Sequence, residues 1–275
     1  MSFLQLVVFA LVQGVTEFVP VSSTTNQILV DYFTGWGGAG RPLDMAAHLG
    51  TLCAVLVYFW RDVGAMIGAL GRATRQLAQG RPLGKDFWLV AKLLVSTFPA
   101  IGAEYLIHLY HPTILRSVEL LVWNTIGFGI LLLVIDKAFM TVRRVEHLSM
   151  IEAFFLGCMQ VLAFMPGVSR SGITATGARL LGMERLEAAR FSFLMAIPAL
   201  AGATAIQGYQ VYEAAETARF IEALMVGGLS MVFGLFALAF IMAWLRNASF
   251  ALFVGYRLAL GAALLVLYYG LPFKL

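Results

Sequence analysis

The chain has 275 residues, of which 60% are hydrophobic and only 12% are charged, whereas soluble domains carry about 25% charged residues. This composition excludes a soluble globular protein and predicts an all-α integral membrane protein. The formal net charge of +4 fits the enrichment of Lys and Arg in cytoplasmic loops, so we expect no nucleic-acid partner.

Residues 1–12 are apolar, but they are too few to cross a bilayer, which takes about 20 residues. A polar stretch that contains Glu17 and Pro20 follows, and a second short apolar piece then runs to about Phe33. Two short apolar halves around a break predict a re-entrant helical hairpin. Irregular backbone at membrane depth is tolerated only where it is buried in protein or lines a polar cavity.

The next segments alternate between apolar spans and charged connections. Residues 43–60 are predicted to form the first full span, and a loop over 61–86 carries five basic residues: Arg61, Arg72, Arg75, Arg81 and Lys85. The excess of positive charge places this loop on the cytoplasmic side. Spans at about 87–109 and 117–135, joined by a short turn at His111, return the chain to the basic residues Lys137, Arg143 and Arg144.

The second half repeats this plan. A broken element over about 149–182 is centred on Pro166, and three further spans are predicted at 186–206, 220–245 and 249–270. The loop with Glu213 and Glu216 is acidic and fits the outer side. The total is six transmembrane helices plus two re-entrant helical hairpins in one membrane domain, 1–275. We interpret it as an inverted-topology repeat of about 1–136 and 137–275, in which sites form near the membrane midplane.

A shift of 147 residues superimposes the two broken elements in sequence. It places Gln13 on Gln160 and Ser22 on Ser169, and it also matches Val21 with Val168, Ser23 with Arg170 and Thr24 with Ser171. Polar groups at membrane depth are costly and usually functional. We therefore predict that the two copies meet in one polar site that handles a lipid-linked phosphate.

Glu17 and Arg170 are the principal charged candidates. Gln13 and Glu17 are four residues apart, so they share one face of a helix, and a carboxylate there can hold a divalent cation or exchange a proton. The guanidinium of Arg170 matches phosphate oxygens. Two alternatives remain: Glu17 caps a helix or lies near the head groups, or Arg170 and Glu17 form a structural ion pair.

Hydroxyl groups surround these charges. Ser22 and Ser23 are candidate nucleophiles, which need an adjacent base, although such a run is also typical of a simple turn. Ser169, Ser171 and Thr174 add donors, and a helix beginning near Ser171 would favour phosphate at its N-terminus.

His48 lies within a predicted span, and Asp44 precedes it by four residues on the same helical face. It is either a base for the site or a histidine bonded to a neighbouring helix. The chain contains no nucleotide-binding loop, dinucleotide fingerprint or zinc-ligand spacing, and this inventory suits a phosphate ester or anhydride.

At these residues the sequence resembles the undecaprenyl pyrophosphate phosphatase family, also called the bacitracin-resistance protein family. The family's first motif, Glu/Gln-x-x-x-Glu followed by Phe-x-Pro-Val-Ser-Ser-Thr, is matched from Gln13 to Thr24, and its second, Pro-Gly-x-Ser-Arg-Ser-Gly-x-Thr, from Pro166 to Thr174. The element from Asp44 to Thr51 and the run 191–194 are also similar to that family.

The resemblance implies hydrolysis of undecaprenyl pyrophosphate to undecaprenyl phosphate, which recycles a lipid carrier for cell-wall synthesis in the bacterial inner membrane. It also implies a divalent cation (Mg²⁺ or Ca²⁺), an outward-facing site and homodimers. The predicted catalytic residues are Glu17, Ser23, Arg170 and His48, with Glu17 also the metal ligand. The predicted contacts to the pyrophosphate lipid are Gln13, Ser22, Thr24, Asn26, Ser169, Ser171 and Thr174.

One residue departs from the family pattern. The family usually has Gly-His after the first motif, where this chain has Thr25 and Asn26. Asn26 cannot take up a proton near neutral pH or act as a nucleophile. Either Glu17 or His48 activates Ser23, or the chain is a lipid-phosphate transporter, flippase or non-catalytic lipid-binding paralogue.

Overall fold

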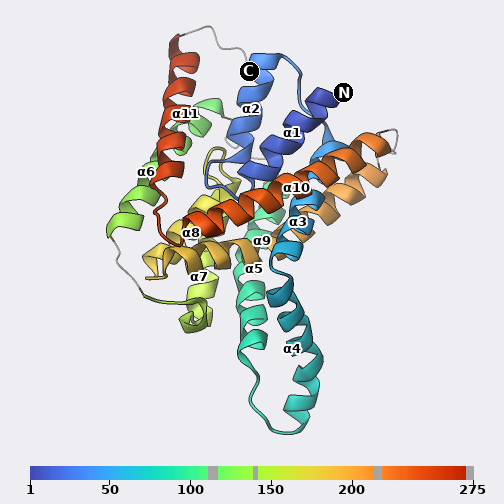
Figure 1. Cartoon of the computed structure of the whole chain (residues 1–275), viewed down its shortest axis with the longest axis vertical. Helices are drawn as coiled ribbons and strands as arrows, with labels where there is room; N and C mark the ends of the chain where they lie inside the picture. The colour runs from blue at the N-terminus through green and yellow to red at the C-terminus, as the bar shows by residue number, and fades with distance from the viewer. Residues whose placement is uncertain (111–116, 139–141, 214–218, 271–275) are drawn as a thin grey trace.

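The computed structural model describes residues 1–110, 117–138, 142–213 and 219–270. All regular elements of these residues are helices (Figure 1). The turn predicted at His111 and the acidic residue Glu216 lie outside the described residues.

Five helices are long and apolar enough to cross a membrane. They are α5 (Lys85–Tyr110), α6 (Val118–Ala138), α9 (Arg185–Glu213), α10 (Phe220–Trp244) and α11 (Ala251–Gly270). A sixth candidate consists of α3 (Arg41–Tyr58) and α4 (Trp60–Ala78) together, which are bent by 82° where they meet. The prediction of an all-α, multi-pass membrane protein is confirmed. The span predicted at 43–60 corresponds to α3, which is counted only together with α4.

The prediction of a loop over 61–86 is wrong, because most of this stretch is the helix α4. The five basic residues drew attention away from apolar residues that recur with the period of a helix. Met66, Ala69 and Ala73 recur at intervals of three and four and are buried, which is the pattern of a helix with one packed face. Figure 1 shows α4 lying beside the first half of α5, and the two helices are in contact.

Each of the two predicted hairpins consists of two short helices around a break, which is residues 17–22 in the first hairpin and residues 162–169 in the second. The first comprises α1 (Phe3–Thr16) and α2 (Ser23–Thr34). The second comprises α7 (Met150–Val161), one 3₁₀ turn (Leu162–Phe164) and α8 (Arg170–Leu180). The shift of 147 residues therefore takes the start of α1 onto the start of α7, and the start of α2 onto the start of α8. The inverted membrane topology of the two halves stays a prediction.

Packing between the long helices brings the hairpins together. α3 packs against α9 and α10, α1 against α10, α7 against α5, and α11 against α6. At one crossing, a Cβ atom on Gly50 of α3 would lie 2.1 Å from the carbonyl oxygen of Gly227 in α10. Only glycine permits this approach of two backbones.

Buried side chains anchor the two breaks in the core. Phe18, directly after Glu17, has no exposed surface, and its ring meets that of Phe193 edge to face at 5.8 Å between centroids. Val21 and Val168, which correspond under the shift, are 3% and 0% exposed. Apolar anchoring on both breaks fixes the polar residues between them.

Candidate active site

An ion pair joins the two breaks. Nη2 of Arg170, the first residue of α8, donates to Oε1 of Glu17, at the end of α1, over 2.7 Å. Both side chains are largely buried, with 18% and 9% of their surfaces exposed. The other carboxylate oxygen of Glu17 accepts from Gln13 at 2.9 Å, and Gln13 in turn accepts from Gln27 at 2.8 Å. Gln13, which is itself bonded by Gln27, therefore holds the Glu17 carboxylate from one side, and Arg170 holds it from the other side.

One donor nitrogen of Arg170 is not used by the described residues. Its Nη1 atom is buried and has no hydrogen-bond partner among the described residues. A buried donor without a partner costs free energy, so its presence calls for a functional explanation. An anion in the adjacent cavity would satisfy it.

Two serines shape the backbone at this place. Ser22 and Ser169 have φ angles of 69° and 67°, and no other non-glycine residue of the described chain has a positive φ. Each is the N-cap of the next helix, and its hydroxyl accepts from the backbone N–H three residues on. Strained backbone of this kind persists where the surrounding structure enforces it, commonly at functional sites.

A cavity of about 200 Å³ lies between the two breaks. It is lined by residues from both sequence copies: Thr16, Glu17, Ser22, Ser23, Thr24, Ala163, Phe164, Met165, Pro166, Gly167, Ser169 and Arg170. α2 and α8 both begin at residues that line it. The positive end of each helix dipole and its free N–H groups favour an anion there.

The hydroxyl groups of the first motif differ in their availability. Ser22 is 4% exposed, and its oxygen accepts from the Thr25 hydroxyl at 2.9 Å, so it is engaged in the turn. Ser23 and Thr24 also line the cavity, and none of the hydrogen bonds of the described chain involves their hydroxyls. These two hydroxyls are free to contact a ligand.

In the second motif, Ser169 lines the cavity, and its hydroxyl lies 3.3 Å from that of Ser171. Ser171 bonds the carbonyl of Val19 across the two breaks at 3.2 Å. Thr174 is 1% exposed and lies one turn further along α8, where it bonds Ser192 of α9. Of the three predicted contacts, Ser169 therefore lines the cavity, whereas Ser171 and Thr174 hold neighbouring segments.

Asn26 does not line the cavity. It is 7% exposed, and its amide nitrogen donates to the carbonyl of Ser22 at 2.8 Å. Its amide oxygen accepts from the hydroxyl of Tyr256 in α11. At the position where the family usually has histidine, this chain therefore has a residue that ties the first break to α11.

His48 lines a second, adjoining cavity of about 230 Å³ that shares Glu17 and Arg170 with the first. Its lining is mostly apolar and includes Phe164, Ile101, Pro198 and Leu200. Nδ1 of His48 lies 3.3 Å from Oε1 of Gln207, which is the bond to a neighbouring helix that was the alternative to a catalytic role. Glu104 and the buried Gln160, whose Oε1 has no partner among the described residues, line the same cavity.

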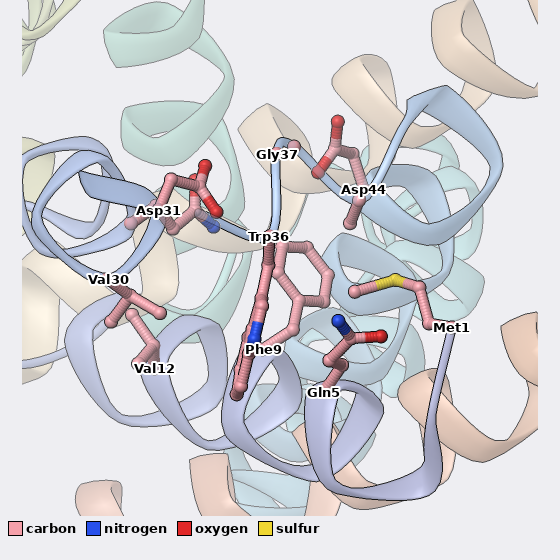
Figure 2. A pocket seen from close by; sticks show the side chains of 12 residues that line it. Met1, Gln5, Phe9, Val12, Val30, Asp31, Trp36, Gly37 and Asp44 are labelled. Carbon is pink, nitrogen blue, oxygen red and sulfur yellow. The ribbon is translucent and has the colours of Figure 1, made fainter. Parts of the chain in front are cut away.

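Asp44, predicted to share a face with His48, lines a different cavity between α1, α2 and the segment 35–40. Figure 2 shows the Trp36 ring beside Phe9, with the carboxylates of Asp31 and Asp44 on either side of Gly37. This third cavity reaches Glu17 only indirectly, because Gln27, which lines it, bonds Gln13. Asp44 is therefore not a partner of the Glu17–Arg170 site.

Arg257 of α11 was missed by the sequence reasoning. Its side chain has no exposed surface, and it donates to five backbone carbonyls: Pro20, Asn124, Thr125, Gly167 and Val168. The signal was present, because Arg257 is the sole charged residue of the predicted span 249–270, and an ionisable residue within a span is a functional candidate.

The cavity between the breaks offers few of the oxygen ligands that a divalent cation needs. No group of three or more His, Cys, Asp or Glu side chains comes together among the described residues. Of the described residues, Glu17 alone brings a carboxylate to the cavity between the breaks. Mg²⁺ is commonly held by one or two carboxylates together with substrate phosphates and water, so the residues fit a cation that arrives with a phosphorylated substrate.

Comparison with known proteins places the chain in context. A family model described as "Bacitracin resistance protein BacA" matches residues 6–263. Undecaprenyl-diphosphatase 1 of Rhodospirillum rubrum is 44% identical over 98% of this chain and 96% of its own length. Undecaprenyl-diphosphatases of a Ruegeria species and of Moorella thermoacetica are 40% and 36% identical over 98% of this chain and 100% and 99% of their own lengths.

Proposed function

The chain belongs to the bacitracin resistance protein BacA family, and from this premise we propose that it hydrolyses undecaprenyl diphosphate to undecaprenyl phosphate. It is a membrane-embedded phosphatase with an isoprenyl diphosphate as its lipid substrate. The observation that carries the proposal is the Glu17–Arg170 ion pair beside the starts of two helices, in which Nη1 of Arg170 has no partner among the described residues.

The polar cavity takes the diphosphate. Arg170 presents its free Nη1 to the phosphate oxygens, since a guanidinium is a strong, permanently charged donor. The N–H groups at the starts of α2 and α8 add donors without a further charge. Phosphoryl transfer depends mainly on positioning and on stabilising charge in the transition state, and these groups supply both.

The nucleophile is the Ser23 hydroxyl or a water molecule that Ser23 positions. Ser23 lies at the first position of α2 and lines the same cavity as Glu17. Glu17 accepts the proton as the nucleophile attacks the terminal phosphorus, and the bond to the bridging oxygen breaks. The lipid monophosphate leaves with the bridging oxygen. When water is the nucleophile, phosphate is released directly; when Ser23 is the nucleophile, a water molecule then hydrolyses the phosphoserine, which releases phosphate and restores the Ser23 hydroxyl. The position of Asn26 outside the cavity makes a histidine there unnecessary for this route.

A divalent cation, Mg²⁺ or Ca²⁺, would be held by Glu17 and by the substrate's own phosphate oxygens. When bound, it would neutralise negative charge on the diphosphate. Arg170 would keep Glu17 in place and hold the remaining oxygens.

The adjoining cavity with His48 suits the first isoprene units. Its walls are mainly apolar, it shares Glu17 and Arg170 with the polar cavity, and it is bordered by the spans α5 and α9. A lipid with its head group at Arg170 would extend along this cavity towards the bilayer. His48 at its wall would then contact the substrate near the head group.

We further propose that the protein lies in the bacterial inner membrane as a homodimer, with its site on the outer side. Residues 61–86 and 143–144 are rich in Lys and Arg, which supports a cytoplasmic position for α4 and for the segment that precedes α7. The transporter and flippase alternative is not favoured, because relatives that match over 96% and 100% of their own lengths are named undecaprenyl-diphosphatases.

The test is phosphate release from a C15 or C55 isoprenyl diphosphate by the purified full chain, with and without Mg²⁺ or Ca²⁺. Glu17→Gln and Arg170→Ala should each abolish most turnover. Arg143→Ala, which breaks an ion pair of the same 2.7 Å length outside the cavity, is the matched control and should retain it.

Two outcomes would count against the proposal. Turnover that is unchanged in Glu17→Gln and Arg170→Ala would place the chemistry elsewhere. A folded native chain without turnover that gains it in Asn26→His would make this chain a binding or transport protein that has kept the cavity.

A further inference from the structure

We propose that Arg257 is a positioning residue for the proposed phosphatase reaction. It holds the two breaks in the relative position and orientation that the site requires. The expected effect of Arg257 on kcat rests on the proposed function. Its effect on the position of the two breaks rests on the contacts of Arg257 alone.

The side chain of Arg257 connects three segments that are far apart in sequence. Nη1 donates to the carbonyl of Pro20 at 3.4 Å and to that of Val168 at 3.0 Å, so one nitrogen joins the first break to the second. Nη2 donates to Gly167 at 2.8 Å and to Asn124 at 3.2 Å. Nε donates to Thr125 of α6 at 2.9 Å.

No carboxylate forms an ion pair with Arg257 among the described residues. A fully buried cation is normally paired with an acid, because removing a charge from water is costly. Here the charge is compensated by the carbonyl dipoles of the two breaks. Those carbonyls in turn point at Arg257, so their peptide N–H groups have a defined direction.

The direction of these peptides matters to the site. Pro20 and Val168 lie one or two residues before Ser22 and Ser169, the two caps with positive φ. Gly167 itself lines the polar cavity. A rotation of either peptide would move the cap and the first turn of α2 or α8, and with it the donors that face the phosphate.

The surroundings leave room for this guanidinium. A Cβ atom on Gly129 would lie 3.3 Å from Arg257, and one on Gly172 would lie 3.3 Å from its Nη1. Gly167 has a φ of 86°, and a Cβ atom on it would lie 2.3 Å from the carbonyl oxygen of Leu121. Gly129 and Gly172 therefore leave room for the arginine, and Gly167 lets the second break lie close to the backbone of α6.

The role differs from that of a second buried arginine, Arg179. Arg179 is 3% exposed and pairs with the buried Asp136 at 3.0 Å, where α6, α8 and α9 end or begin. Its guanidinium donates to the carbonyls of Met183 and Asp136, which both lie outside the two breaks. Arg179 is therefore a matched control for the general effect of changing a buried arginine.

The experiment compares Arg257→Lys, Arg257→Met and Arg179→Lys in the full chain, with an isoprenyl diphosphate as substrate. Lysine keeps the charge but cannot reach five carbonyls. We expect Arg257→Lys to lower kcat by about 10- to 100-fold with KM within about threefold, and Arg257→Met to lose more. Arg179→Lys should lower the melting temperature and leave kcat per folded molecule within about threefold.

A second readout does not need activity. Hydrogen–deuterium exchange should rise at residues 20–26 and 167–173 in Arg257→Lys, and not in Arg179→Lys. If exchange rises there while the native chain shows no turnover, the positioning role stands and the proposed function fails. Equal kcat losses in the two lysine variants, or unchanged exchange at both breaks, would overturn the role of Arg257.

Discussion

Ser22 and Ser169 lie 147 residues apart and adopt nearly the same strained conformation, with φ of 69° and ψ of 105° in the first and φ of 67° and ψ of 117° in the second. Each is an N-cap, and each follows a buried valine. The two segments therefore repeat one local design, a short helix, a break and a serine-capped helix. Both copies deliver a helix start to one polar cavity.

This strain predicts an unusual ranking of substitutions at Ser169. Glycine loses the cap but adopts a positive φ freely, whereas alanine loses the cap and keeps the strain. Ser169→Gly should be more stable than Ser169→Ala by about 1–2 kcal/mol, measured by thermal unfolding in detergent. Ser149, an N-cap with an ordinary φ of −81°, is the control, and glycine's advantage over alanine should be smaller there, because no backbone strain is relieved. An equal advantage at both serines would contradict the explanation.

Asn26 and Tyr256 should behave as a structural pair. Asn26→Ala removes the partner of both the Tyr256 hydroxyl and the Ser22 carbonyl, so it should cost about 2 kcal/mol, and Tyr256→Phe about 1 kcal/mol. The double variant Asn26→Ala/Tyr256→Phe should lose less than the sum, because the two share one hydrogen bond. Full additivity in unfolding experiments would argue against the pair.

The same pair bears on catalysis. Since Asn26 does not line the cavity, Tyr256→Phe should leave KM for the isoprenyl diphosphate within about threefold. A large rise in KM would show that this hydrogen bond reaches the substrate.

The crossing of α3 and α10 depends on Gly50. A Cβ atom there would lie 2.1 Å from a backbone oxygen that cannot rotate away, so Gly50→Ala should destabilise the protein by about 3 kcal/mol. Gly64 of α4 faces open space, and Gly64→Ala should instead add about 0.5–1 kcal/mol. The two melting temperatures should therefore move in opposite directions, and a shared direction would contradict the packing seen at Gly50.

An ion pair outside the candidate spans makes stability depend on pH. The hydrogen bond from Arg143 lowers the pKa of Glu152 to about 2 from its ordinary 4.5. The contribution of the Arg143–Glu152 ion pair to the free energy of unfolding is therefore complete above about pH 4.5 and is lost as the pH falls towards about 2. Arg143→Met should flatten the fall in melting temperature across this window. An unchanged slope would mean that the pair adds nothing to the folded state.

Much of this architecture could be predicted from one sequence. Composition and hydrophobic runs predicted the membrane helices, and the repeat at a shift of 147 residues predicted that the two motifs meet. α4 was missed because its charges were weighted above the period of its buried residues. No motif includes Arg257, because its partners are backbone carbonyls, which carry no signal of residue type. Its place as the sole charged residue of the predicted span 249–270 was the one signal in the sequence.

The position of Asn26 was also beyond the sequence. Its neighbour in space, Tyr256, is 230 residues away, and no spacing rule connects them. The residue looked like a lost catalytic group in the motif, whereas its contacts are those of a structural tie.

The most direct measurement is a double-mutant cycle on kcat/KM for an isoprenyl diphosphate, using Glu17→Gln, Arg170→Gln and the two combined. If the two motifs act as one catalytic unit, each single variant should lose about 10²–10³-fold, and the double variant should lose little more than either one. Losses that multiply in the double variant would mean that Glu17 and Arg170 act independently. Single variants that retain native turnover would contradict an active site at this ion pair.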